Sequence, residues 1–201
     1  HLMNILSNQA MKNESFEWAA QVPEAPEKFR DWLGHQVFAE QDAVSRIAML
    51  KAEYQAFGLF TEAHLLGSVV TDESNHYNWL KGLYRQLYKV EPVKHETKSR
   101  YWDEVVKNSD FSQFIEDNSL GDLAAYGFHA EEMRLYRLWA ICELTKNKGL
   151  YEHATINDTF TKVYCDELHH VAIFASMTTP YAIEKTRKDH ARGADALGLT
   201  P

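Results

Sequence analysis

Two Glu-x-x-His pairs are the residues of this sequence best suited to chemistry. Glu73 precedes His76 by three positions, and Glu167 precedes His170 by the same spacing. On an α-helix this spacing places both side chains on one face about one turn apart, so each pair could offer a carboxylate and an imidazole to one cation. Because a single pair of this kind is commonly a solvated surface feature, the surroundings of the two pairs decide their meaning.

Both glutamates lie at the centre of an apolar helical stripe. A carboxylate buried in such a stripe is costly unless a neighbouring charge compensates it. At about 100° per residue, the stripe around Glu73 contains Leu66, Val69, Val70, Tyr77 and Leu80, and the stripe around Glu167 contains Phe160, Val163, Tyr164, Val171 and Phe174. Two such costs in equivalent places predict a shared cation.

Two further stripes carry a carboxylate at a matching level. Glu40 precedes Glu73 by 33 residues, so an antiparallel hairpin would bring the two side by side. Glu131 and Glu132 precede Glu167 by 36 and 35 residues, which levels them across a second hairpin. Glu131 lies about 40° from the centre of its stripe and Glu132 about 60° on the other side. This favours Glu131 slightly and leaves Glu132 as the alternative.

The elements that must position these residues are helices. Apolar spacing predicts long helices over about 26–58, 61–88, 120–146 and 156–177, two short pieces around 101–106 and 111–115, and a more polar helix over about 181–197. No segment has the alternation of a strand. We expect an N-terminal arm over residues 1–25, of which 1–22 are loose or swapped because they lack periodicity, and one helical domain over 26–201.

The loop lengths predict how the four long helices are connected. Short loops near residues 59 and 150 indicate two antiparallel hairpins, and the long connection over about 89–119 lets the second hairpin cross over. This is the topology of an all-α four-helix bundle with one long crossover connection and extra short helices.

The order Glu, Glu-x-x-His, Glu, Glu-x-x-His on four successive helices resembles the ferritin-like di-iron and di-manganese carboxylate proteins, in their oxygenase or rubrerythrin-like branch. The resemblance covers about residues 26–177. It implies that each Glu-x-x-His pair supplies one bridging carboxylate and one terminal imidazole. The implied ligands are Glu40, Glu73, His76, Glu131 or Glu132, Glu167 and His170. Oxygen and nitrogen ligands suit two iron ions, or manganese as the alternative, and include no thiolate to favour zinc.

The resemblance implies an oxygen-activating di-iron oxygenase or oxidase. Such an enzyme would act with O2 on an unidentified small molecule and take electrons from a separate reductase. The first alternative is a peroxide-consuming di-manganese or di-iron enzyme of the catalase or rubrerythrin kind. A second alternative is a non-enzymatic iron-binding or storage bundle. A metal-free helical interaction module comes last, because it leaves the buried acids unexplained.

The composition limits the partners. The net charge of −8 argues against a nucleic-acid or anionic-membrane partner, and no apolar run approaches the roughly 18 residues that a membrane span needs. Cys142 and Cys165 both fall in helical patterns, so we expect reduced core thiols in a cytoplasmic protein. Aromatic residues in the crossover, expected to be exposed, favour a homodimer.

Overall fold

The computed structural model describes residues 9–21, 26–94, 100–107, 110–148 and 154–196. Within these ranges the protein is all-helical and contains no strand, which confirms the predicted class. The helices are α2 (Gln9–Ala20), α3 (Pro26–Ala56), α4 (Phe60–Tyr88), α5 (Arg100–Val106), α6 (Phe111–Asp117), α7 (Leu120–Lys148), α8 (Ala154–Met177) and α9 (Pro180–Ala196). All seven predicted helical segments are therefore present.

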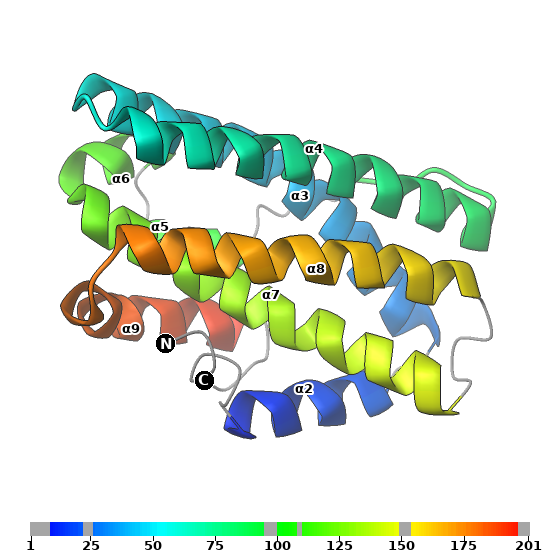
Figure 1. Ribbon diagram of the computed structural model, residues 1–201. Coiled ribbons are helices and arrows are strands. Elements are labelled where there is room, and N and C mark those ends of the chain that lie inside the picture. Colours follow the sequence, from blue (N-terminus) through cyan, green and yellow to red (C-terminus); the bar gives the residue numbers. More distant parts are fainter. Residues whose placement is uncertain (1–8, 22–25, 95–99, 108–109, 149–153, 197–201) are drawn as a thin grey trace.

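The four long helices form two antiparallel pairs, α3 with α4 and α7 with α8, and α4 packs beside α8 (Figure 1). The turn between α3 and α4 contains Gly58 at φ 75°, a conformation that glycine adopts without steric cost. Helix ends follow ordinary chemistry: Pro26 and Pro180 open α3 and α9. The Asp110 side chain caps α6 by accepting a hydrogen bond from the backbone N–H of Gln113 at 2.8 Å.

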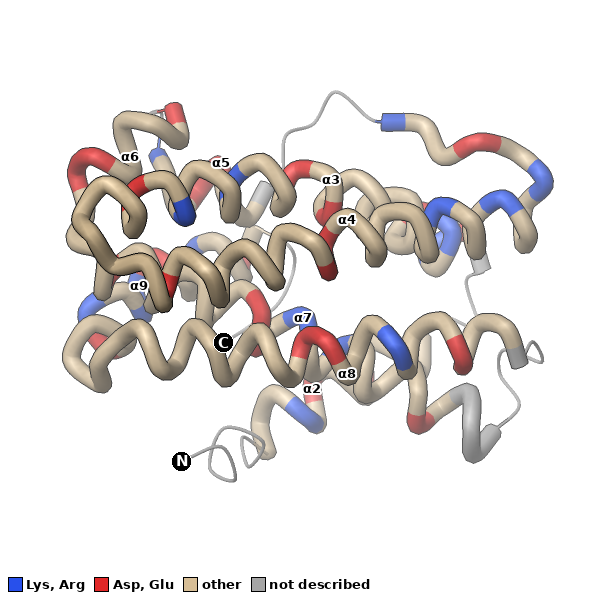
Figure 2. Tube along the Cα trace, turned by 45° about the horizontal axis from the view of Figure 1, so that its top comes forward, with Lys and Arg blue, Asp and Glu red and all other residues tan. Residues whose placement is uncertain are grey.

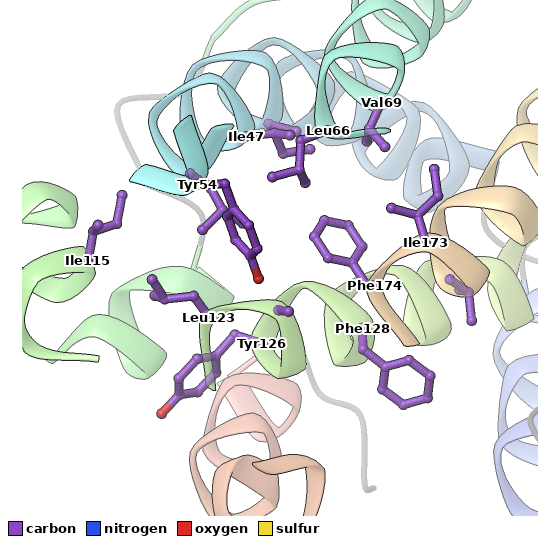
Figure 3. Close-up of a cluster of buried hydrophobic side chains, with 14 of the residues drawn as sticks. Ile47, Tyr54, Leu66, Val69, Ile115, Leu123, Tyr126, Phe128, Ile173 and Phe174 are labelled. Carbon is purple, nitrogen blue, oxygen red and sulfur yellow. The ribbon is translucent and has the colours of Figure 1, made fainter. Parts of the chain in front are cut away.

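Two apolar cores fill the interior, one toward each end of the long helices. Core 1 lies where α3 ends and α4 begins, also takes in residues of α5 and α6, and contains Leu66, Phe128 and Phe174 (Figure 3). Core 2 lies toward the other end and contains Leu33 and Phe160. Each long helix contributes to both cores, so whatever lies at mid-length is enclosed on two sides by apolar packing.

One glycine allows α7 and α8 to approach closely in core 1. A Cβ atom at Gly127 would lie 2.5 Å from the Phe174 ring, closer than real carbon atoms approach each other. Phe174 is itself almost fully buried. Residue 127 therefore has no room for a side chain unless the ring moves.

The N-terminal segment differs from the expectation. Residues 9–20, predicted to be part of a loose or swapped arm, form helix α2, which packs against α7. The Phe16 ring lies edge-on to Trp139 at 5.1 Å between centroids, and Ala19 is fully buried in core 2. Burial of these apolar side chains holds α2 in place, although the sequence of α2 has little apolar periodicity. Residues 1–8 and 22–25 lie outside the described residues.

Two other expectations concern the aromatic residues of the crossover and the two cysteines. The crossover aromatics that favoured a homodimer pack inward: Tyr101 is buried, and Trp102 and Phe111 pack against core 1. Neither cysteine forms a disulfide; Cys142 is partly buried, whereas Cys165 is exposed, so the placement of Cys165 as a core thiol was wrong. In the described part of the chain, no helix has the length and apolarity needed to cross a membrane.

Candidate metal centre

Six of the seven predicted ligands converge at mid-length of the four long helices, between the two cores. They are Glu40 on α3, Glu73 and His76 on α4, Glu131 on α7, and Glu167 and His170 on α8. Figure 2 shows acidic positions midway along α4 and α8. All six side chains are buried. The hairpin registers predicted from the spacing therefore bring the carboxylates to one level.

The six residues form two overlapping groups that could each hold a metal ion. The first group is Glu40, Glu73, His76 and Glu167, and the second is Glu73, Glu131, Glu167 and His170. Within each group, one ligand atom per residue lies within 4.8 Å of the others. Glu73 and Glu167 belong to both groups, so the two groups share two carboxylates.

The structure decides between the two candidates on the third long helix. Glu131 belongs to the second group, whereas Glu132 lies in neither. One further residue turns the side chain by about 100° around the helix, away from the other carboxylates. Glu132 is only half-buried, and this burial raises the pKa of its carboxyl to about 7.

Unsatisfied polar atoms mark the centre as suited to a cation. Glu40 Oε1, Glu73 Oε1 and His76 Nδ1 are buried and make no hydrogen bond. Buried polar atoms without a partner are costly, and native proteins contain few of them. A metal ion that accepts oxygen and nitrogen ligands would satisfy all three atoms, so the donor set fits such an ion.

Both imidazoles point Nδ1 into the centre and Nε2 away from it. His76 Nδ1 lies 3.7 Å from Glu40 Oε2 and 3.6 Å from Glu167 Oε1. His170 Nδ1 lies 3.3 Å from Glu73 Oε1 and 3.2 Å from Glu167 Oε2. Each Nδ1 therefore has carboxylate oxygens as its neighbours.

Two aspartates orient these rings, and the sequence analysis did not identify them. His76 Nε2 donates to Asp166 on α8 at 3.1 Å, and His170 Nε2 donates to Asp72 on α4 at 3.3 Å. Each aspartate directly precedes a ligand glutamate, so the motif on both helices is Asp-Glu-x-x-His. That repetition was the available signal. These carboxylates fix each imidazole with Nδ1 directed toward the centre.

Arg134 of α7 is the third residue of the cluster that the sequence alone did not reveal. Its Nη1 lies 2.9 Å from both Glu40 Oε2 and Glu167 Oε1, 3.4 Å from Glu73 Oε2, and 3.6 Å from Glu131 Oε2. The guanidinium thus lies among all four carboxylates. Glu131 and Arg134 are three positions apart, which is the spacing of the two Glu-x-x-His pairs with arginine in place of histidine.

The crowded charges change the proton affinities of the centre. Burial raises the pKa values of Glu40 and Glu131, and burial with the neighbouring Glu40 and Glu167 raises the pKa of Glu73 to about 8. Burial acts in the same direction on Glu167, but Arg134 and the histidines outweigh it and hold the pKa of Glu167 well below its ordinary value. One carboxylate is thus held ionised by internal cations.

His129, which precedes Glu132 by one helical turn, lies in neither ligand group. Its ring stacks on His190 of α9 at 4.6 Å between centroids, and its Nε2 is hydrogen-bonded to the carbonyl oxygen of Ile183 at 3.1 Å. Burial lowers the pKa of His129 to about 4. Its role is therefore to join α7 to α9.

Comparisons of this chain with protein-family models, with curated proteins and with solved structures found no match. The side chains of the centre are therefore the only indication of function in the described part of the chain.

Proposed function

We propose that this protein is a ferritin-like four-helix bundle that uses two iron ions to activate dioxygen, as an oxygenase or oxidase acting on a small, fairly apolar molecule. The observation that carries the proposal is the pair of overlapping ligand groups with two shared carboxylates. Two ions held a few Å apart by bridging groups form a recurrent arrangement for two-metal catalysis. Each Asp-Glu-x-x-His motif supplies the histidine of one group, and its aspartate orients the histidine of the other motif.

Each residue of the centre has a distinct part in this proposal. Glu73 and Glu167 would be shared by the two ions, while Glu40 with His76 and Glu131 with His170 would complete the two groups. Two ferrous ions bound there would supply electrons and open coordination positions for dioxygen reduction. A separate reductase would restore those electrons between turnovers.

The apolar cores on both sides would support dioxygen activation by excluding water from the centre. Valines and leucines of the long helices flank the ligands, and a dry surrounding protects a reactive site from side reactions. These flanking residues are Val37, Val69, Leu80, Leu135, Val163 and Val171, all of them nearly or fully buried.

Arg134 favours a second candidate, a metal-free helical interaction module whose acids are held by an internal cation. The guanidinium already contacts four carboxylates. However, three buried polar atoms of the cluster remain without a hydrogen bond when the guanidinium is in place. The metal-bound centre accounts for those atoms, and the metal-free module does not.

The test is anaerobic loading with ferrous iron, followed by iron counting and mixing with dioxygen. We expect about two ions per chain, consumption of dioxygen, and new near-ultraviolet absorption. Glu167→Ala should lower the iron count. Glu132→Ala is the control, because Glu132 is an acid that lies in neither ligand group, and it should leave the iron count unchanged.

Other results would select the alternatives. Sustained oxygen release from hydrogen peroxide by the manganese-loaded protein, with an iron form inert to dioxygen, would select the peroxide-consuming enzyme. Bound iron that reacts with neither oxidant would indicate storage or structure. A wild-type protein that binds no metal would leave the metal-free module.

A further inference from the structure

The Arg134 guanidinium is placed unequally between the two ligand groups. Its closest contacts, both at 2.9 Å, are with Glu40 Oε2 and Glu167 Oε1. These are the same two oxygens that face His76 Nδ1. Glu131, which belongs only to the second group, is the most distant carboxylate at 3.6 Å. The guanidinium therefore occupies the side of the first group.

The two shared carboxylates divide their oxygens between Arg134 and His170. Glu73 directs Oε2 to Arg134 at 3.4 Å and Oε1 to His170 at 3.3 Å. Glu167 directs Oε1 to Arg134 and Oε2 to His170 Nδ1 at 3.2 Å. One oxygen of each shared carboxylate thus remains on the His170 side, together with an imidazole nitrogen that can bind a metal.

A guanidinium and a metal ion cannot share the first group. Arginine stays protonated and has no lone pair to offer, so it cannot become a ligand and repels a divalent ion nearby. It can withdraw, since its side chain is long and 15% exposed, compared with 1% or less for Glu40, His76 and Glu167. Arg134 therefore approaches the centre from the surface side.

We propose that the two positions fill in a fixed order. The second group, which contains Glu131 and His170, binds the first ion, while Arg134 supplies the positive charge of the first group, which contains Glu40 and His76. The second ion enters when Arg134 withdraws toward solvent. This inference rests on the proposed metal centre and adds Arg134 as the residue that determines how tightly the second ion binds.

The first experiment is a calorimetric titration of the wild-type protein with cobalt(II), which is redox-stable. We expect two classes of site whose dissociation constants differ by at least about 10-fold. His170→Ala should remove the tight class, whereas His76→Ala should retain it and lose the weak one. Anomalous scattering from crystals with one equivalent of cobalt should place the ion beside His170.

The second experiment removes the competing charge. Arg134→Gln should tighten the second ion by at least about 10-fold and make the two classes similar. Arg137→Gln is the matched control, because Arg137 lies three positions further along α7 and its guanidinium faces the Trp18 ring instead of the cluster. It should leave both constants unchanged.

The outcomes separate this inference from the proposed function. Two equal sites in the wild type, a first ion beside His76, or an Arg134→Gln protein with unchanged constants would overturn the loading order while leaving a two-metal centre intact. A wild-type protein that binds no cobalt would overturn both. If Arg134→Gln fails to fold without metal, the wild-type and histidine titrations still decide.

Discussion

Replacing Arg134 by leucine should destabilise the metal-free protein by an amount that grows with pH. At 2.9 Å from each of two buried carboxylates, the guanidinium gains roughly 6 kcal/mol per pair at an effective dielectric constant of about 20. Desolvation of the guanidinium offsets several kcal/mol of this sum. We therefore expect a loss of about 3–5 kcal/mol, the usual measured cost of removing one partner of a buried ion pair, and not the full Coulomb sum. For a chain of this length, that corresponds to a melting temperature lowered by roughly 6–20 °C.

The sign of the pH dependence follows from the carboxyl groups that Arg134 contacts. The folded-state pKa values of Glu40, Glu73 and Glu131 are raised, so the stability they contribute is present below their ordinary pKa and is lost as pH rises through the folded value, about 8 for Glu73. Removing Arg134 raises these values further. The variant can therefore compensate by binding protons at pH 5.5, and this compensation weakens as pH rises toward and beyond 8.

The assay is thermal and urea denaturation of metal-free wild type and Arg134→Leu from pH 5.5 to 8.5. Arg137→Leu is the control, since it makes the same substitution on α7 outside the cluster and should show no such trend. Saturating cobalt should reduce the difference in unfolding free energy between wild type and Arg134→Leu, because the ions supply the missing positive charge. A deficit that is constant or shrinks with rising pH would refute this account of the centre.

Three further predictions test separate features. Gly127→Ala should cost about 1–3 kcal/mol of unfolding free energy because its Cβ would meet the Phe174 ring, while the control Gly82→Ala, with nothing within 4 Å, should be neutral or gain roughly 0.5–1 kcal/mol; equal effects would contradict the close approach of α7 and α8. Asp72→Asn and Asp166→Asn should each weaken cobalt binding about 10–100-fold in calorimetry while the helical circular dichroism is retained; unchanged binding would deny them an orienting role. Burial raises the pKa of Glu132 to about 7, so the wild type should lose at most about 3 kcal/mol of unfolding free energy between about pH 4.5 and pH 7. Glu132→Gln should remove this loss, and parallel pH profiles of wild type and variant in urea denaturation would contradict the prediction.

The sequence was sufficient to predict seven of the eight described helices and the clustering of six candidate ligands, because both follow from helical periodicity. Apolar spacing located the long helices, and the 33-residue separation of Glu40 from Glu73 correctly placed them at one level across a hairpin. The choice between Glu131 and Glu132 was narrow, since the two lie on opposite sides of one stripe. Only the packing of α7 against its neighbours decided it.

Three features escaped prediction because they depend on contacts between helices. Asp72 and Asp166 lie off the apolar stripes of their own helices, and each acts on a histidine of the other helix. Arg134 has no apolar stripe or motif that marks it, because its partners come from all four long helices. Helix α2 has little apolar periodicity of its own, and it gains burial only against α7.

The division of the interior into two cores has a consequence for local unfolding. Core 1 is packed by α5, α6 and α9 as well as the long helices, whereas core 2 is closed by α2. A charged centre joins the two cores and adds little apolar cohesion, so opening fluctuations at one end need not spread to the other. Native-state hydrogen exchange should accordingly resolve two protected groups of amides, and bound ions should merge them into one cooperative unit.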